Sequence, residues 1–317
     1  MLVSGKMELS DDCMKEDSDE RENKMKQLIN VEKKQETLSL ITQIAYANVS
    51  SWYNCSRRDL YMDLIVPKTM AGHERMPAIV WICGGAFRVV DRSVWIPELL
   101  HFARAGYVVA SVDYRTGNEA AFPQPLMDIK AAIRYLKAHS AEYCIDPDRI
   151  FIMGESAGGT LAALAGTTVG KKEYEVGEHL EYDSSVAGVV DFYGITSFTE
   201  SPYVIPDLTV NFLGADYSEE TAEAASAVCQ ADENTPPFLI LHGAGDSRVP
   251  LKQSEVLYEK LLEKGVETEL WILEDAAHGA DLFYQDEVLA RVIQFLEQQQ
   301  VAFPAVHSVL EQVPNRV

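Results

Sequence analysis

The sequence lacks the features that mark four specialised classes of protein. Its five cysteines are an odd number and widely scattered, with no Cys-x-x-Cys pair, which argues against a disulfide framework and against a zinc site. No stretch reaches the roughly 18 apolar residues of a membrane span. Residues 1–12 lack the apolar core of a secretory signal, so we expect an intracellular protein of the cytoplasm.

Positive charge is scarce as well. The chain carries 27 Lys and Arg against 49 Asp and Glu, a formal net charge of −22. Such an excess of negative charge repels nucleic acid and anionic membrane surfaces, so we expect neither as a partner and expect a small-molecule substrate instead. The hydrophobic content of 47% is sufficient for a large core, and the sequence contains no internal repeat.

The composition of the chain changes at about residue 36. Residues 1–36 have mixed charge and few aromatic side chains, which indicates a charged N-terminal arm. Residues 37–317 contain apolar runs separated by helical patterns, and strands that alternate with helices predict a mostly parallel sheet with helices on both faces. The predicted fold class is therefore α/β, in one domain. The apolar runs are residues 78–83, 107–112, 149–153, 186–192, 238–241 and 269–273.

Residues 196–236 do not follow this alternation and are predicted to form a small insertion. The segment follows the strand pattern that ends near Phe192, so it leaves the sheet at its carboxyl edge. A cap or lid over that edge and an ordinary surface loop are both compatible with the pattern. We expect its apolar side chains to pack over the edge, because an exposed loop rarely keeps so many. They are Tyr203, Val204, Ile205, Leu208, Phe212, Leu213 and Tyr217.

Residues 154–159 read Gly-Glu-Ser-Ala-Gly-Gly, between an apolar run and a helical stretch of small residues. The order of strand, sharp turn and helix matches the Gly-x-Ser-x-Gly elbow, which holds a serine on a strained turn with its hydroxyl exposed. Ser156 is therefore the predicted nucleophile. The alternative is a glycine-rich turn that only joins a strand to a helix.

A serine nucleophile needs a base within hydrogen-bonding reach and a third group that orients the base. On this elbow the chain order is serine, then an acid, then a histidine. Asp246 follows the apolar run 238–241 and His278 follows the run 269–273, so both are expected at the edge of the sheet that carries Ser156. We predict that His278 is the base and Asp246 the acid.

Three other side chains compete for these two roles. His242 is the rival base, but it lies at the start of the Asp246 loop and is better placed to orient that loop. Glu274 and Asp275 are rival acids. They are so close to His278 in sequence that reaching its far ring nitrogen is difficult.

The reaction also needs N–H donors for the negative charge that develops on the carbonyl oxygen of the substrate. The N–H of Ala157, directly after the nucleophile, is one predicted donor. The second should come from the loop that starts at Cys83 and reads Cys-Gly-Gly-Ala-Phe. Within it, Gly85 and Ala86 are the predicted residues, because small side chains let backbone N–H groups approach the oxygen.

Together, these motifs resemble those of the α/β-hydrolase fold, and more narrowly those of serine carboxylesterases related to hormone-sensitive lipase and of bacterial feruloyl and acetylxylan esterases. The resemblance covers about residues 48–296 and includes Asp113 and Arg115, which look like a structural ion-pair corner. One position departs from the family pattern. The family loop usually reads His-Gly-Gly-Gly, and here Cys83 takes the place of the histidine, which leaves the triad intact but removes a support of the loop.

The resemblance implies a serine carboxylesterase that cleaves small acyl or aryl esters through an acyl-enzyme, with no metal or organic cofactor. Acetylated and feruloylated carbohydrates are candidate substrates, and Phe87, Tyr203 and Phe212 are expected to contact the substrate. Two alternatives share the fold. One is a serine peptidase of the oligopeptidase type, although such enzymes usually carry a large extra domain. The other is a binding protein with an inactive site, although such proteins usually lack the serine or the histidine.

Overall fold

The computed structural model describes residues 28–70, 72–199 and 204–302. Contacts within the chain divide it into two units, with the boundary between Glu36 and Thr37. In the first unit, residues 28–36 are described and form neither helix nor strand. All elements named below belong to the second unit, and none of its described helices combines the length and the apolar content needed to cross a membrane.

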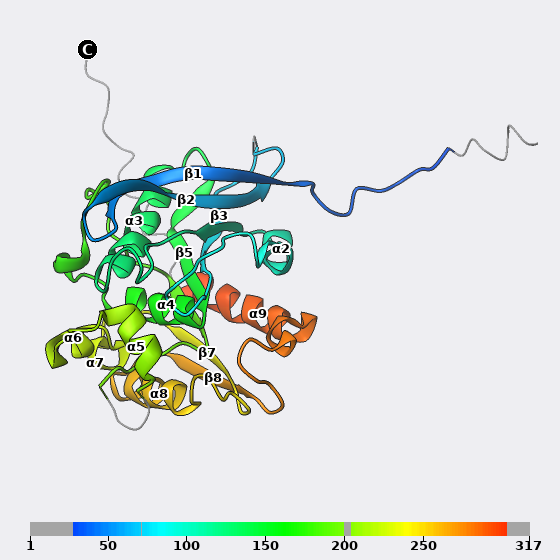
Figure 1. The fold of residues 1–317 in the computed structure, drawn as a ribbon. Helices are drawn as coiled ribbons and strands as arrows, with labels where there is room; N and C mark the ends of the chain where they lie inside the picture. Colours follow the sequence, from blue (N-terminus) through cyan, green and yellow to red (C-terminus); the bar gives the residue numbers. More distant parts are fainter. Residues whose placement is uncertain (1–27, 71, 200–203, 303–317) are drawn as a thin grey trace, which may run out of the picture. The chain divides into compact units, whose positions relative to one another are not determined.

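In the described part of the chain, eight strands form one sheet in the order β1-β2-β4-β3-β5-β6-β7-β8 (Figure 1). β1 pairs antiparallel with β2, and β2 antiparallel with β4, whereas every other neighbouring pair is parallel. The prediction of a mostly parallel sheet is confirmed. The strands are β1 (Leu38–Ser51), β2 (Ser56–Pro67), β3 (Met76–Ile82), β4 (Val108–Val112), β5 (Ile145–Glu155), β6 (Gly188–Phe192), β7 (Phe238–Gly243) and β8 (Thr268–Leu273).

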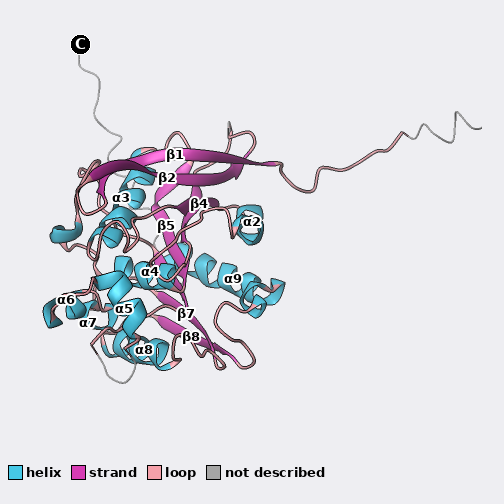
Figure 2. Cartoon of the chain, viewed as in Figure 1, coloured by secondary structure: helices cyan, strands magenta, loops and turns pink. Residues whose placement is uncertain are grey.

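Helices cover both faces of the sheet, as the alternation predicted (Figure 2). Successive side chains of a strand point to opposite faces, so Val80 joins one hydrophobic cluster and its neighbour Trp81 joins the other. The first cluster includes side chains of α3, α4 and α8, and the second includes side chains of α2 and α9. These helices are α2 (Ile96–Arg104), α3 (Gln124–Ala138), α4 (Ala157–Thr167), α8 (Lys252–Glu263) and α9 (Asp286–Ala302).

Three short helices lie within residues 196–236, namely α5 (Pro206–Leu213), α6 (Glu219–Ala224) and α7 (Ala227–Gln230). Of the apolar side chains expected to pack there, Leu208, Phe212 and Leu213 are buried in the first cluster. Tyr217 is 38% exposed, and Tyr203 lies outside the described residues. The insertion is therefore held to the core through α5, with Ala222 of α6 and Ala227 of α7 also buried in that cluster.

Residues 171–185 also depart from the alternation of strands and helices, and two buried cations of α3 hold this segment. Lys130 and Arg134 are fully buried, and both contact the carboxylate of Glu175. The segment is a loop with one 3-10 turn, η1 (Lys172–Tyr174). Because a buried charge without its partner is strongly destabilising, these ion pairs fix the loop against α3.

Asp191, near the end of β6, is a fully buried acid. Its Oδ1 accepts the N–H of Gly194 at 2.9 Å, and its Oδ2 has no hydrogen-bond partner among the described residues. Burial raises the pKa of Asp191 to about 6, while the Gly194 hydrogen bond and the attraction of His242 oppose the shift. The carboxyl group therefore becomes charged close to neutral pH, in a place that disfavours charge.

Asp191 should make the folded state less stable as pH rises. An unfolded aspartate has a pKa of about 3.9, so a folded pKa of about 6 gives a stabilising contribution that is fully present below pH 4 and is lost as pH rises through 6. The whole difference corresponds to about 3 kcal/mol. Asp191→Asn cannot ionise, so its free energy of unfolding relative to the wild type should rise by roughly 2 kcal/mol between pH 4.5 and 8 in urea titrations. Parallel pH profiles for the two proteins would contradict this expectation.

Candidate active site

Ser156 lies on a sharp turn between β5 and α4. Its backbone has φ +54° and ψ −118°, which is strained for a residue other than glycine. The turn can close because Gly158 has no side chain: a Cβ there would lie 2.0 Å from the carbonyl oxygen of Ile82 in β3. The Ser156 N–H donates to the carbonyl of Phe192 in β6 at 2.9 Å. The strained elbow expected from the glycine-rich motif thus lies at the carboxyl edge of the sheet.

His278 and Asp246 meet Ser156 at this edge. Asp246 lies in the loop after β7 (residues 244–250, the acid loop), and His278 lies in the loop after β8. His278 Nε2 is 2.9 Å from Ser156 Oγ, and His278 Nδ1 is 2.6 Å from Asp246 Oδ2. An ionised carboxylate can only accept, so Nδ1 carries the proton and Nε2 is free to accept the hydroxyl proton of Ser156. The three side chains form one continuous hydrogen-bonded relay.

The Asp246 side chain is held in its charged form by its surroundings. It is 1% exposed, and its Oδ1 accepts the backbone N–H groups of Arg248 and Val249, both at 2.8 Å. Burial raises the pKa of Asp246, but hydrogen bonds from His242, from His278 and from the backbone outweigh burial and hold that pKa well below its usual range. The carboxylate can therefore stabilise a positive charge on His278 at neutral pH.

His242, the rival base, supports the acid loop. Its imidazole is fully buried, with Nε2 donating to the carbonyl of Val249 at 2.9 Å and Nδ1 accepting from Ser254 Oγ at 2.7 Å. Nε2 also lies 3.4 Å from Asp246 Oδ2. Because both ring nitrogens are engaged in this way, neither is left for Ser156.

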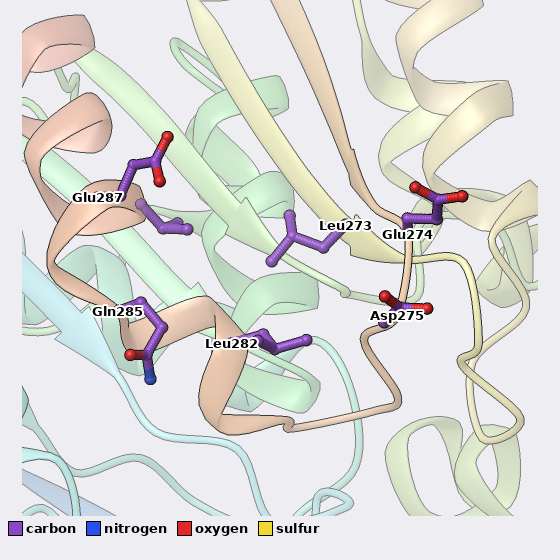
Figure 3. A pocket seen from close by; sticks show the side chains of 7 residues that line it. Leu273, Glu274, Asp275, Leu282, Gln285 and Glu287 are labelled. Carbon is purple, nitrogen blue, oxygen red and sulfur yellow. The ribbon is translucent and has the colours of Figure 1, made fainter.

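Glu274 and Asp275, the rival acids, line a separate cavity of about 300 Å³ (Figure 3). Its other walls come from the end of β8, from the 3-10 turn η2 (Asp281–Tyr284) and from the first turn of α9. Glu287 adds a third carboxylate to this cavity. The hydrogen bond that orients the His278 ring comes from Asp246.

The loop after β3 (residues 83–89, the β3 loop) carries two of the predicted N–H donors. Gly85 and Ala86 have positive φ, +135° and +56°. Their N–H groups, like that of Ala157, donate to no acceptor among the described residues. N–H groups without a partner, at the edge that carries Ser156, can bind an oxygen on which negative charge develops.

The carbonyl groups of the β3 loop, in contrast, accept hydrogen bonds from three residues of two neighbouring segments. The donors are Tyr114 Oη to Cys83 O (2.9 Å), Asn211 Nδ2 to Ala86 O (3.1 Å) and the Gly117 N–H to Phe87 O (2.7 Å). Because Tyr114 and Gly117 follow β4 while Asn211 belongs to α5, the loop is fixed from two sides.

Glu155, which the sequence analysis did not single out, ties the β3 loop to the nucleophile. Its carboxyl group is buried, and Oε1 accepts the Gly84 N–H at 2.5 Å, the Trp95 indole N–H at 3.2 Å and the Cys83 thiol at 3.9 Å. Burial raises the pKa of Glu155, although these hydrogen bonds oppose the shift. The support that a histidine would give the loop comes here from the residue directly before Ser156. In the sequence, this supporting role was indicated only by the presence of an acidic residue within the Gly-x-Ser-x-Gly motif.

Cys83 is a buried thiol. Burial raises the pKa of Cys83 to about 12, and the charge of Glu155 adds to the shift. A thiol in this state is protonated and is a poor nucleophile. Cys83 therefore packs beneath the β3 loop, and the hydroxyl of Ser156 is the nucleophile that the geometry offers.

Phe87 and Phe212, two of the three residues expected to contact the substrate, are each 1% exposed. Their rings stack with 4.3 Å between centroids, and Phe122 and Phe198 lie 5.5 and 5.4 Å from Phe212. This aromatic cluster packs α5 against the β3 loop. Contact of Phe87 and Phe212 with a substrate stays a prediction, and the third residue, Tyr203, lies outside the described residues.

The chain is similar to proteins of one matched family and to several solved structures. A family model described as BD-FAE matches residues 62–261 of the chain. Among curated proteins, the probable carboxylic ester hydrolase LipM of Mycobacterium tuberculosis is 32% identical over 193 residues, which are 58% of this chain and 44% of LipM. The chain spans about half the length of the curated relatives it matches.

Two solved structures resemble the chain over most of its length. A truncated carbohydrate esterase from gut microbiota is 26% identical, with a TM-score of 0.74, and the match covers 86% of this chain and 100% of that one. Esterase 2 of Thermogutta terrifontis with bound butyrate is 25% identical, with a TM-score of 0.68, and the match covers 84% of this chain and 94% of that one.

Replacing Glu155 tests whether it fixes the β3 loop. Glu155→Ala removes the acceptor of the Gly84 N–H, so hydrogen exchange in peptides that cover residues 83–89 should become faster by about tenfold or more. Glu155→Gln keeps a side-chain oxygen in place and should stay within about threefold of the wild type. Unchanged exchange in Glu155→Ala, with an unchanged melting temperature, would show that the other contacts hold the loop without it.

Proposed function

The chain belongs to the BD-FAE family, and on that basis we propose that it is a carboxylic ester hydrolase with a serine nucleophile. The predicted resemblance to carboxylesterases of the α/β-hydrolase fold is confirmed by the matched family and by the similar solved structures. The observation that carries the proposal is the relay of Ser156, His278 and Asp246, with 2.9 and 2.6 Å between successive side chains.

The proposed reaction has two halves. Ser156 Oγ attacks the carbonyl carbon of the ester while His278 Nε2 takes the hydroxyl proton, and Asp246 stabilises the resulting imidazolium. The bond to the alcohol then breaks, His278 returns the proton to the leaving oxygen, and the acyl group stays on Ser156. In the second half, water attacks the acyl-enzyme with His278 again as base, which releases the acid and restores the serine.

Backbone N–H groups are the proposed binding site for the negative oxygen. Ala157 supplies one donor from the start of α4, and Gly85 and Ala86 supply the β3 loop's contribution. In well-studied hydrolases, the loss of one such donor raises the barrier by about 3 kcal/mol. The anchoring of the β3 loop by Glu155 supports this assignment, because the donors must be in place before charge develops.

The proposed substrate is an ester with a short acyl or aryl group, including acetylated or feruloylated carbohydrate. The solved relatives include a carbohydrate esterase and an esterase with bound butyrate. The rings of Phe87 and Phe212 stack and are both buried where α5 packs on the β3 loop, and we expect them to limit the length of acyl chain that the site accepts. The net charge of −22 also disfavours adsorption to anionic lipid.

Helix α5 is the proposed cap of the acyl site. Asn211 donates to Ala86 of the β3 loop, and Asp207 forms an ion pair with Arg248 of the acid loop at 2.7 Å. One short helix thus contacts both the loop that carries the N–H donors and the loop that carries the acid. A helix in that position bounds the space between them.

Neither alternative function is favoured. A binding protein with an inactive site would not need an intact relay of serine, histidine and aspartate. LipM and the gut carbohydrate esterase, two of the similar proteins, are named as ester hydrolases. We also propose that the protein acts in the cytoplasm and without a metal or organic cofactor.

Single substitutions should separate the relay from its rivals. Ser156→Ala and His278→Ala should each lower kcat for p-nitrophenyl acetate by about 10⁴-fold or more, because the three groups act as a unit. Asp246→Asn should lower kcat by about 10²- to 10⁴-fold, and Asp275→Asn, the matched control, by less than about twofold. A crippling effect of Asp275→Asn, or retention of a tenth of the activity by a folded Ser156→Ala protein, would overturn the assignment.

The acyl preference should depend on the aromatic cluster. We expect kcat/KM for p-nitrophenyl esters to be highest from acetate to butyrate and to fall steeply for longer chains. Phe212→Leu opens space beside Phe87 and should raise the ratio of hexanoate to butyrate hydrolysis by about threefold or more. Tyr217→Phe, at an exposed position of the same insertion, should leave the profile unchanged. An optimum at decanoate, or a profile indifferent to Phe212→Leu, would show that α5 does not bound the acyl site.

A further inference from the structure

The turn between β1 and β2 exposes two large aromatic side chains. Trp52 is 69% exposed and Tyr53 is 62% exposed. Together with Asn54 they form a run of three residues with positive φ, at +49°, +49° and +71°, a conformation uncommon outside glycine. Such a backbone persists only where its surroundings fix it.

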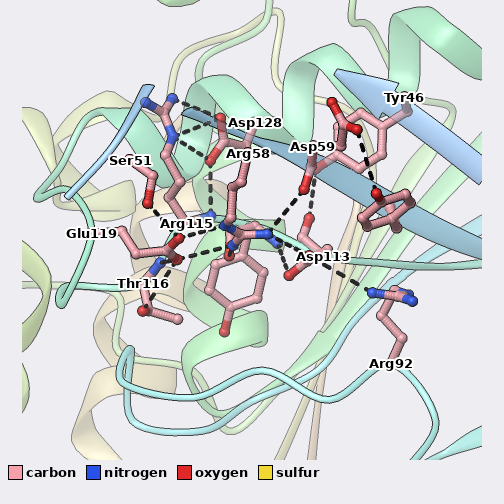
Figure 4. A network of polar contacts seen from close by, with 12 residues as sticks. Tyr46, Ser51, Arg58, Asp59, Arg92, Asp113, Arg115, Thr116, Glu119 and Asp128 are labelled. Carbon is pink, nitrogen blue, oxygen red and sulfur yellow. Dashed lines mark hydrogen bonds and ion pairs between the residues drawn. The ribbon is translucent and has the colours of Figure 1, made fainter. Parts of the chain in front are cut away.

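A network of ion pairs and hydrogen bonds fixes the base of this turn (Figure 4). The carbonyl of Glu119 accepts the Tyr53 N–H at 2.8 Å, and its carboxylate accepts Ser51 Oγ at 2.9 Å. Arg58 donates to Glu119 and, at 2.8 Å, to Asp113. The turn therefore rests on a rigid base.

Asp113 and Arg115, expected as an ion-pair corner, contribute to this region with separate partners. Asp113 pairs with Arg58 and Arg92, whereas Arg115 pairs with the buried Asp128 at 2.7 Å (Figure 4). The two residues follow β4 directly, so they hold the chain that leaves β4 against β2 and α3.

The sheet topology places the turn at the edge that carries Ser156. β1 is antiparallel to β2, and β2 is antiparallel to β4, so β1 runs in the same direction as the parallel strands. Its carboxyl end, at Ser51, therefore lies at the carboxyl edge of the sheet. Four strand spacings separate β1 from β5 in the sheet order, which corresponds to about 19 Å.

Hydrogen bonds connect the turn to the β3 loop. Tyr53 Oη donates to the carbonyl of Gly117 at 2.8 Å, and the Gly117 N–H donates to the carbonyl of Phe87 at 2.7 Å. Asn118 Nδ2 donates to the carbonyl of Arg88 at 2.8 Å. The aromatic turn and the candidate active site thus share one connected edge.

We propose that Trp52 and Tyr53 form a platform that binds a sugar ring of a carbohydrate-linked ester, away from the ester bond that is cleaved. The inference rests on the proposed esterase function and adds to it the alcohol side of the substrate. A pyranose ring has an apolar face of C–H groups and a rim of hydroxyls. Exposed indole and phenol rings match it with flat apolar faces, and the indole N–H of Trp52 and the phenol oxygen of Tyr53 add a polar donor and a polar acceptor at the edge. Because β1 alone lies about 19 Å from β5 across the sheet, the platform would contact a sugar several units along the chain from the acylated one.

The size and charge of the platform favour a sugar over a macromolecule. Two side chains cannot supply the roughly 800 Å² per partner that a stable protein interface buries. The net charge of −22 disfavours anionic membranes and nucleic acid. A neutral glycan needs no interface of that size and is not repelled by the negative charge.

Trp52→Ala should impair only substrates long enough to reach the platform. On acetylated xylo-oligosaccharides of increasing length, kcat/KM for the longest should fall by about tenfold through a higher KM. Values for p-nitrophenyl acetate and acetylated xylobiose should stay within about twofold of the wild type. Trp52→Phe keeps an aromatic face and should recover most of the loss. Tyr182→Ala removes an exposed aromatic ring from the loop packed on α3 and, as the matched control, should change nothing.

Direct binding distinguishes a failure of this platform from a failure of the proposed function. Titration calorimetry of unesterified xylohexaose into Ser156→Ala protein needs no catalysis, and adding Trp52→Ala should weaken binding by about tenfold. A wild-type protein that does not hydrolyse p-nitrophenyl acetate would overturn the esterase proposal, while the calorimetry would still decide the platform. Three results would overturn the platform. The first is that xylohexaose does not bind, or binds equally well with and without Trp52→Ala. The others are an equal loss of kcat/KM on all substrates, and an effect of Trp52→Ala on dimer formation in sedimentation alone.

Discussion

The hydrogen bond from the Gly84 N–H to the buried carboxyl group of Glu155 joins the two segments on which the candidate site depends. One segment is the strained elbow that carries Ser156, and the other is the β3 loop, where the N–H groups of Gly85 and Ala86 have no acceptor within the described part of the chain. The same carboxyl oxygen also accepts from Trp95, just before α2. A donor left without its acceptor in such a buried place costs about 1–3 kcal/mol, so this side chain stabilises the relative position of the nucleophile and the N–H donors.

Much of this arrangement could be predicted because parallel strands share an edge. Ser156, Asp246 and His278 each follow a strand pattern, so their order along the chain was enough to expect them together. The mostly parallel sheet could be predicted because its parallel strands are largely apolar runs, a pattern typical of strands buried on both faces, and the structure confirms it. The choice between Asp246 and Asp275 needed a geometric argument about ring nitrogens, and the structure places Asp246 beside His278.

Other features depend on contacts that no local pattern reveals. Glu155 occupies a variable position of its motif, and its partner Gly84 is 71 residues away. Asp113 and Arg115 were expected to form an ion-pair corner, but the sequence could not identify their partners, which come from β2, from the segment before α2 and from α3. Phe212 was expected to pack, but its contacts with the rings of Phe87, Phe122 and Phe198 could not be predicted. The insertion has no periodicity from which a buried face can be identified.

The buried thiol of Cys83 has a practical consequence for chemical labelling. Alkylating reagents react with accessible thiolates, and burial keeps this thiol protonated, so a maleimide should spare the β3 loop. Among the described cysteines, Cys55 and Cys229 are exposed. Cys55 lies in the same turn as Trp52, so a fluorophore attached there would report on events at the aromatic turn.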